Sequence, residues 1–145
     1  LRVDIESMLV DKSLKVSDLP DIWNEQIKQY LGLEVPDDSL GVLQDIHWSG
    51  GQFGTFCNYT IGNVMAAQLM DTMIKKQPVI QDEINKANYT PLLNWLTANI
   101  HKHGRRYSRN ELLVKSTGEI LNPIPYIKYL KNKASEVYGV KFKND

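Results

Sequence analysis

Residues 60–76 have the sequence TIGNVMAAQLMDTMIKK, in which apolar side chains recur at intervals of three and four positions. The recurring residues are Ile61, Val64, Met65, Leu69 and Met73. This spacing predicts an amphipathic helix with a heavily buried face. Each methionine occupies a position that the apolar stripe already requires, so we interpret the methionines as core packing and not as ligands of a cofactor or a soft metal.

Further helices are predicted on both sides of this stretch. One covers residues 1–11, and others follow the start signals Asp18-Leu19-Pro20, Thr90-Pro91, Ser108-Arg109-Asn110-Glu111 and Asn122-Pro123. The last helix is expected to turn Tyr126, Ile127, Leu130, Ala134 and Val137 inward. Gly32, Gly104 and Gly139 stand where helices would end. The sequence therefore predicts an all-α fold of about six or seven helices, with residues 1–145 forming a single helical domain or fragment.

The helical period fails between Glu34 and Tyr59. This stretch gathers glycine, proline and aromatic residues, among them Pro36, Gly41, Trp48, Gly50, Gly51, Phe53, Gly54 and Phe56. Loops longer than about 12 to 15 residues are uncommon in compact domains and tend to be functional. We therefore expect the functional residues of the chain to lie in this one long loop.

Composition limits the classes of partner. The 17 basic and 17 acidic side chains cancel, which removes the long-range field that would attract nucleic acid. No segment approaches the ~20 consecutive apolar residues of a membrane span, so neither nucleic acid nor membrane is expected as a partner. The lone Cys57 excludes an internal disulfide and a multi-cysteine zinc site. It favours a reducing compartment, and we expect the cytoplasm.

The residues needed for common catalytic centres are missing. A zinc peptidase helix needs His-Glu-x-x-His, with two histidines on one helix face and a glutamate between them, and the chain has no such string. His101 and His103 are interpreted as helix-end cations or as hydrogen-bonding residues at the edge of the core. Cys57 is interpreted as an inert small apolar residue. We therefore expect no metal or other cofactor in this chain alone.

The strongest motif is Gly41-Val42-Leu43-Gln44-Asp45-Ile46-His47-Trp48, which has the pattern GxxQDxHW without a mismatch. It resembles a signature of the carboxypeptidase Taq family of zinc metallocarboxypeptidases. Residues 18–38, 59–69, 100–104 and 117–123 carry further similarity to that family. The resemblance covers nearly the whole chain but only the C-terminal part of the family's usual length. It implies that the metal-binding His-Glu-x-x-His region lies upstream of residue 1.

The resemblance implies an all-helical zinc enzyme that removes single residues from peptide C-termini. In that frame His47 would donate to the substrate carboxylate or the oxyanion, Gln44 would position the substrate backbone, and Tyr59 would offer its phenol to the tetrahedral intermediate. Asp45 and Trp48 would support the loop. Each of these residues could instead have a structural role. His47 would then be a histidine at the edge of the core bonded to Asp45, Gln44 an amide that stabilises the loop, and Tyr59 a packing contact at the start of a helix.

The sequence departs from the family pattern at Thr55 and Cys57, where the family commonly has Tyr and Pro. Any catalytic part of that tyrosine would be missing here. The resemblance also implies three partners, namely peptide C-termini, the N-terminal remainder of the same enzyme, and a second copy in a homodimer. On this hypothesis the chain is inactive alone. The alternative is a non-catalytic helical module that binds peptide or serves as structure. The first residue, which is not Met, and the uncapped first helix favour the fragment.

Overall fold

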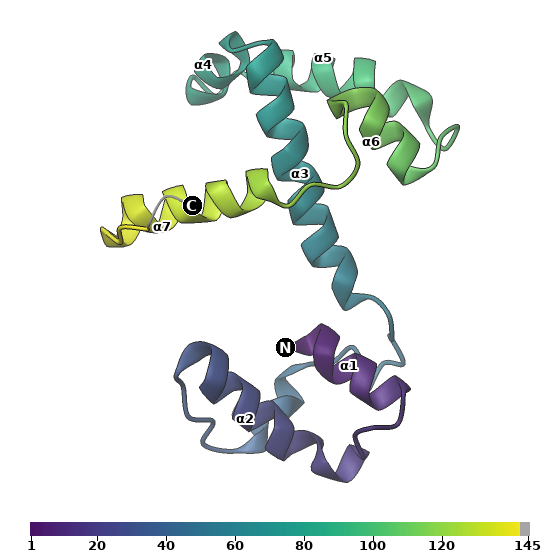
Figure 1. The fold of residues 1–145 in the computed structure, drawn as a ribbon, viewed down its shortest axis with the longest axis vertical. Coiled ribbons are helices and arrows are strands. Elements are labelled where there is room, and N and C mark those ends of the chain that lie inside the picture. The colour runs from purple at the N-terminus through teal and green to yellow at the C-terminus, as the bar shows by residue number, and fades with distance from the viewer. Residues whose placement is uncertain (143–145) are drawn as a thin grey trace. The chain divides into compact units, whose positions relative to one another are not determined.

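The computed structural model describes residues 1–142, and these residues form helices, turns and loops without a β-strand. The chain divides into two compact units, one ending at Thr60 and the other beginning at Ile61. Figure 1 labels the α-helices of each unit. The predicted all-α class is confirmed for the described residues. The assignment of residues 1–145 to one C-terminal domain stays a prediction.

The N-terminal unit contains two α-helices and three short 3-10 turns. The α-helices are α1 (Arg2–Val10) and α2 (Leu19–Leu31). The 3-10 turns are η1 (Val16–Asp18), η2 (Asp38–Leu40) and η3 (Val42–Gln44). Gly32 ends α2 in the left-handed conformation, with φ of 67°, and its amide donates to the Lys28 carbonyl. The predicted stop at Gly32 is therefore confirmed.

The core of this unit joins its two helices to the start of the long loop. Ile5 from α1, Trp23 from α2 and Val42 from η3 are each at most 8% exposed, and Leu14 completes the cluster. Because Val42 lies in this core, it fixes the loop segment that follows it. The loop is therefore packed against the core at Val42, just before the segment that contains Asp45 and His47.

The long helix α3 (Phe56–Lys76) begins four residues earlier than the apolar spacing predicted. Phe56 is 7% exposed, so its ring is buried at the helix start. Burial of this aromatic side chain favours an early helix start. The polar residue Asn58 interrupts the apolar spacing, so the pattern alone did not indicate this start. Tyr59 consequently lies in the first turn of α3, where its side chain is exposed.

The C-terminal unit contains the rest of α3 and four further α-helices. These are α4 (Val79–Asn85), α5 (Thr90–Asn99), α6 (Arg109–Thr117) and α7 (Ile124–Tyr138), with the 3-10 turn η4 (His101–His103) after α5. Helix α4 was not predicted. Met73, Ile80 and Trp95 form the core of this unit. The capping box of Ser108 and Glu111 is confirmed at the start of α6.

A buried amide organises the connection between α6 and α7. Gln68 is 1% exposed, and its Nε2 donates to Thr117 Oγ1 at 3.1 Å and to the Ile120 carbonyl at 2.9 Å. Its Oε1 accepts a hydrogen bond from the Asn122 amide at 3.0 Å. Three bonds from one side chain satisfy the polar groups of this connection, which lie close to the core.

The predicted inward face of α7 is only partly covered: Tyr126 and Ala134 are half-buried, and the other three residues are exposed. Ile127, Leu130 and Val137 are 43%, 44% and 59% exposed, and none of the residues of α7 is fully buried. The helix instead places Tyr126 and Tyr129 beside a pocket of about 230 Å³ in its unit, lined also by side chains of α3. An apolar stripe specifies that a helix face is suited to burial, whereas the neighbouring elements decide whether it is covered.

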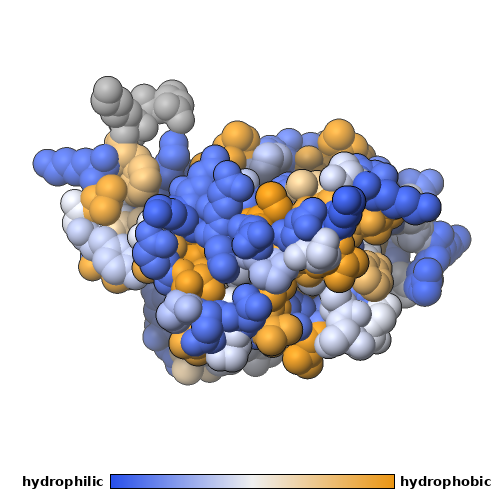
Figure 2. Space-filling view, turned by 90° about the horizontal axis from the view of Figure 1, so that it is seen from below, coloured by the Kyte–Doolittle hydropathy of each residue, from blue (hydrophilic) through white to orange (hydrophobic). Residues whose placement is uncertain are grey.

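Apolar side chains are also exposed elsewhere. On the face shown in Figure 2, they form several separate patches among hydrophilic side chains. Ile46 and Leu43 of the long loop are 76% and 70% exposed, and Val16 is 75% exposed. No helix of the described residues is both long and apolar enough to cross a membrane.

Candidate active site

The GxxQDxHW segment is held in place by a close backbone approach at Gly41. A Cβ atom at this position would lie 2.7 Å from Val35 Cγ1 and 3.2 Å from the Asp37 carbonyl oxygen. A side chain larger than hydrogen would therefore displace the turn. Asp37 caps this turn by accepting a hydrogen bond from the Leu40 amide at 3.1 Å. Together these contacts fix the point from which Gln44, Asp45 and His47 project.

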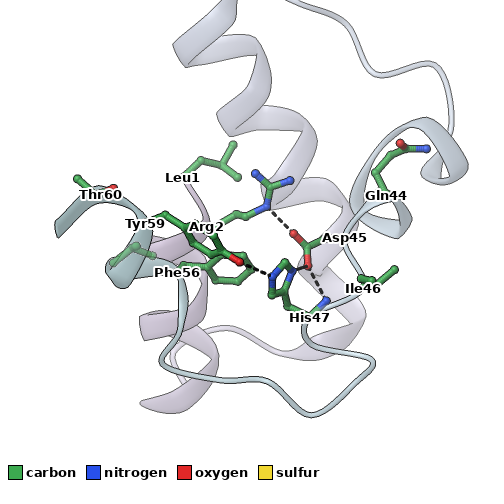
Figure 3. A pocket seen from close by; sticks show the side chains of 10 residues that line it. Leu1, Arg2, Gln44, Asp45, Ile46, His47, Phe56, Tyr59 and Thr60 are labelled. Carbon is green, nitrogen blue, oxygen red and sulfur yellow. Dashed lines mark hydrogen bonds and ion pairs between the residues drawn. The ribbon is translucent and has the colours of Figure 1, made fainter. Parts of the chain in front are cut away.

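A pocket of about 660 Å³ opens beside this segment within the N-terminal unit. Its lining comes from α1, the long loop and the first turn of α3, and consists of Leu1, Arg2, Val3, Gln44, Asp45, Ile46, His47, Phe56, Tyr59 and Thr60. Figure 3 shows these side chains around the pocket, with Arg2, Asp45, His47 and Tyr59 joined by dashed lines. Three chain segments distant in sequence therefore contribute to one concave site.

Asp45 connects the cation on α1 to the imidazole of the loop. Its Oδ2 accepts from Arg2 Nε at 2.6 Å. Its Oδ1 accepts from the His47 backbone amide at 2.8 Å and lies 2.9 Å from His47 Nδ1. An ionised carboxylate only accepts hydrogen bonds, so Nδ1 carries a proton in this contact. The carboxylate therefore sets the tautomer of His47 and orients its ring.

The other ring nitrogen of His47 faces Tyr59. The distance between His47 Nε2 and Tyr59 Oη is 3.3 Å. In the neutral ring with a proton on Nδ1, Nε2 accepts, so the phenol donates. Donation from Nε2 requires a ring that carries protons on both nitrogens. The pair can thus present either a phenol or an imidazolium proton to a ligand oxygen in the pocket.

The environment of Asp45 changes its pKa. Burial alone would raise the pKa, because the carboxylate is only 4% exposed. Hydrogen bonds from the backbone and ring of His47, and the hydrogen bond and charge of Arg2, outweigh this effect and hold the pKa of Asp45 below its ordinary value of 3.8. Asp45 therefore stays ionised at neutral pH.

This shift predicts a pH dependence of stability. A depressed pKa contributes stability that is present above the unfolded-state value of 3.8 and is lost as pH falls through the lower folded-state pKa. We expect Asp45→Asn to lose this component, so that the difference in unfolding free energy between wild type and variant shrinks below about pH 4. Urea unfolding at several pH values between 3 and 6 measures it. A difference that stays constant across this range would contradict the assignment.

Aromatic rings support the cluster from inside the unit. The Trp48 ring lies edge-on to Trp23 and to Phe56, with centroids 6.3 Å and 5.7 Å apart. The Phe56 ring lies 4.8 Å from the His47 ring. The Arg2 guanidinium lies 5.1 Å from the Trp23 centroid and 5.8 Å from that of Phe56. These contacts pack the Arg2 guanidinium and the His47 imidazole against aromatic rings of the N-terminal unit.

The structure brings some of the predicted site residues together and separates others. His47, Asp45 and Tyr59 meet in the pocket. Gln44 lies in the pocket wall, and its Nε2 donates to the Ser39 carbonyl oxygen. Trp48 packs into the unit with its indole N–H donating to Glu6. The roles of these residues in binding and catalysis stay predictions.

Sequence reasoning missed two residues of this region, Arg2 and Glu6. Arg2 lies 43 positions from Asp45 in the chain, and Glu6 lies 42 positions from Trp48. Both stand at the start of a short helix in which nothing in the local spacing marks them as functional. Their position one helical turn apart, at i and i+4 on α1, was the available signal that they share a face.

The other candidate residues lie apart from the cluster. Cys57 Sγ contacts the Gly54 carbonyl oxygen at 3.5 Å. His101 and His103 belong to η4 of the C-terminal unit. Burial and the charges of Lys102, Lys115 and Arg106 lower the pKa of His103, which disfavours the charged form of its ring. The interpretations of these two histidines as helix-end cations or as hydrogen-bonding residues at the core edge stay predictions.

The donor set of the described residues does not fit a metal centre. Within residues 1–142, no three His, Cys, Asp or Glu side chains are grouped so that they could hold an ion. The pocket offers one imidazole and one carboxylate that are already bonded to each other.

Comparison with known proteins places the chain in a family. The family model described as carboxypeptidase Taq (M32) metallopeptidase matches residues 1–134. Carboxypeptidase 1 of Bacillus subtilis is 38% identical over 138 residues, which are 95% of this chain and 28% of that protein. Thermostable carboxypeptidase 1 of Pyrococcus furiosus is 37% identical over 133 residues, which are 92% of this chain and 27% of that protein.

Solved structures agree with this assignment. The crystal structure of an M32 carboxypeptidase from Deinococcus radiodurans matches with a TM-score of 0.88 and 39% identity, over 94% of this chain and 28% of that one. Metallocarboxypeptidase 1 of Trypanosoma cruzi matches with a TM-score of 0.86 and 40% identity, over 91% of this chain and 28% of that one. The chain therefore belongs to the carboxypeptidase Taq metallopeptidase family and spans about a quarter of the length of these relatives, at their C-terminal end.

Proposed function

We propose that this chain is the C-terminal part of a zinc metallocarboxypeptidase that removes single residues from peptide C-termini. In this proposal the chain supplies groups that bind the substrate and the transition state and is inactive alone. The observation that carries the proposal is the chain of contacts from Arg2 through Asp45 and His47 to Tyr59 along one wall of a pocket. The zinc would be held by the N-terminal remainder of the enzyme, and it would activate the water.

The pocket has the groups that a peptide C-terminus requires. A terminal carboxylate needs a cation or several donors at the end of its site. Arg2 uses Nε for Asp45, and Figure 3 shows its two terminal nitrogens pointing away from that carboxylate. The Arg2 side chain is 44% exposed, so it is accessible to a ligand. Arg2 therefore offers a fork of donors whose orientation Asp45 has already set.

His47 and Tyr59 suit the second requirement, the stabilisation of negative charge that develops on the carbonyl oxygen. The contacts with Asp45 and with each other hold the His47 ring and the Tyr59 phenol in place before substrate arrives, which lowers the cost of reorganisation in the transition state. In the protonated ring, Nε2 would donate to the oxyanion or to the substrate carboxylate. The Tyr59 phenol would turn from His47 to the tetrahedral intermediate. Gln44 would position the substrate backbone from the opposite part of the wall.

The exposed apolar side chains of both units support an N-terminal remainder as partner. Tyr138, Ile46 and Val16 are 79%, 76% and 75% exposed. A stable isolated protein exposes few large apolar patches. A part taken from a larger fold exposes the apolar side chains that the rest of that fold would cover. The homodimer implied by the family and the cytoplasmic location inferred from the single cysteine stay predictions, and light scattering and cell fractionation test them.

The experiment compares this chain with the same protein extended upstream to include a His-Glu-x-x-His motif. We expect only the extended protein to bind zinc in stoichiometric amount and to release C-terminal residues from a peptide. A peptide with an amidated C-terminus is the matched control, because it lacks the carboxylate for Arg2. If the extended protein binds zinc and peptide but releases nothing, a non-catalytic peptide-binding module is the better account.

A further inference from the structure

Glu6 is a buried acid that the proposed reaction does not use. It lies in α1 and is 7% exposed, while the neighbouring carboxylate on the same helix, Asp4, is 58% exposed. Burying a carboxylate costs several kcal/mol unless hydrogen bonds replace its water. The contacts that replace water therefore indicate what this side chain is for.

Both carboxylate oxygens of Glu6 bind the long loop. Oε2 accepts from Trp48 Nε1 at 3.1 Å, and Oε1 accepts from the Gly54 backbone amide. These partners lie at the two ends of the segment 48–54, which contains three glycines. One side chain therefore holds both ends of the most glycine-rich part of the loop.

This segment folds back onto His47. The Gln52 amide donates to the His47 carbonyl oxygen at 2.8 Å, and the Gly50 amide donates to the Ile46 carbonyl oxygen at 3.0 Å. Gly51 and Gly54 both have φ of 74°, a conformation that glycine adopts without strain. Glycine also has many alternative conformations, so the segment needs an anchor to keep one arrangement.

The anchor points connect to the imidazole through ring contacts. Trp48 follows His47 directly in the chain, and its ring lies against Phe56. Phe56 follows Gly54 by two residues, and its ring lies 4.8 Å from the His47 ring. Fixing the Trp48 indole and the Gly54 amide therefore fixes both the backbone of His47 and the ring on which it packs.

We infer that Glu6 is a positioning residue that holds the 48–54 segment so that the His47 ring keeps its direction in the pocket. The inference rests on the proposed function. Helix α1 then binds the loop at two points through one of its faces, because Arg2 and Glu6 lie one turn apart on that face. Arg2 binds Asp45 before His47 in the chain, and Glu6 binds the segment that follows His47.

The test uses Glu6→Gln in the active, upstream-extended protein. The amide keeps the size of the side chain but turns a donor toward Trp48 or Gly54, so one of the two bonds is lost. We expect kcat/KM to fall about tenfold to a hundredfold, as for misplacement of a catalytic group by a fraction of an ångström to one ångström. Asp4→Asn, which removes an exposed carboxylate from the same helix, is expected to leave activity unchanged.

A double-mutant cycle separates positioning from general stability. If Glu6 acts through His47, Glu6→Gln lowers activity by less than about threefold when His47 is already alanine. Equal losses in both backgrounds would overturn the inference, as would wild-type activity in Glu6→Gln. If Glu6→Gln does not fold, Trp48→Phe removes one of the two bonds and keeps most of the ring packing, and the same cycle applies.

Hydrogen exchange gives a readout that is independent of peptidase activity. The Gly54 amide is expected to exchange about tenfold faster in Glu6→Ala than in wild type, because this variant removes both carboxylate oxygens and with them the acceptor of that amide. Asp4→Ala should leave this rate unchanged. An unchanged rate in Glu6→Ala would show that Glu6 does not hold the loop. If wild-type extended protein releases no residues, the proposed function fails, and the exchange rate alone decides whether the anchor exists.

Discussion

Replacing His47 with alanine is expected to lower kcat/KM of the upstream-extended protein about 100- to 1000-fold, the usual cost of removing one donor from an oxyanion site. Asp45 holds the imidazole at 2.9 Å and Nε2 faces Tyr59 at 3.3 Å, so the direction of the ring is set before substrate binds. The measurement is release of the C-terminal residue from a peptide under conditions where wild type and variant bind equal amounts of zinc.

The division between kcat and KM distinguishes the two tasks proposed for His47. A loss mainly in kcat indicates contact with the oxyanion, whereas a rise mainly in KM indicates contact with the substrate carboxylate. His101→Ala is the matched control, since this exposed histidine belongs to η4 of the other unit. A loss of less than tenfold for His47→Ala would contradict a direct role and would favour the interpretation of His47 as a structural histidine of the loop.

Replacing Trp23 with alanine is expected to destabilise the N-terminal unit by about 3–5 kcal/mol, the typical cost of removing a large buried aromatic side chain. Trp23 is 4% exposed and belongs to the core cluster of its unit. Its ring also contacts Trp48 edge-on and lies under the Arg2 guanidinium. Urea unfolding of the extended protein, followed by circular dichroism, measures the change.

Trp23→Phe is the control for this prediction. It keeps an aromatic ring in the core and is expected to cost less than half as much as alanine, because most of the buried contact remains. Activity is expected to fall in Trp23→Ala even where the protein is folded, since Trp48 and Arg2 lose a common support. A loss of stability below about 1 kcal/mol would show that the ring is not a central part of this core.

Much of the fold follows from local patterns. The stop at Gly32 and the capping box of Ser108 are short-range signals, and both are confirmed in the structure. The start of α3 was predicted too late because burial of Phe56 depends on the rings around it and not on the spacing within the helix. The exposure of Leu130 on α7 was missed for the same reason, since an apolar stripe does not specify which neighbouring elements, if any, pack against it.

The candidate site was found only in part from the sequence. The GxxQDxHW pattern drew attention to Gln44, Asp45 and His47, which do lie in one pocket. Arg2 and Glu6 were missed, because the residues next to a charged side chain in an amphipathic helix do not indicate whether that side chain is functional. Their partners lie more than 40 residues away, and the contacts exist only after α1 packs against the loop.

The sequence by itself determined the all-α class, several helix ends and the segment that lines the candidate site, because periodicity, capping and a concentration of glycine and aromatic residues are properties of neighbouring residues. Only the tertiary structure decided that Asp45 lies between Arg2 and His47, that Tyr59 faces the same ring, and that Glu6 holds the glycine-rich segment. These arrangements depend on contacts between side chains that are far apart in the sequence. Burial removes water from their polar groups, so these groups form hydrogen bonds within the protein.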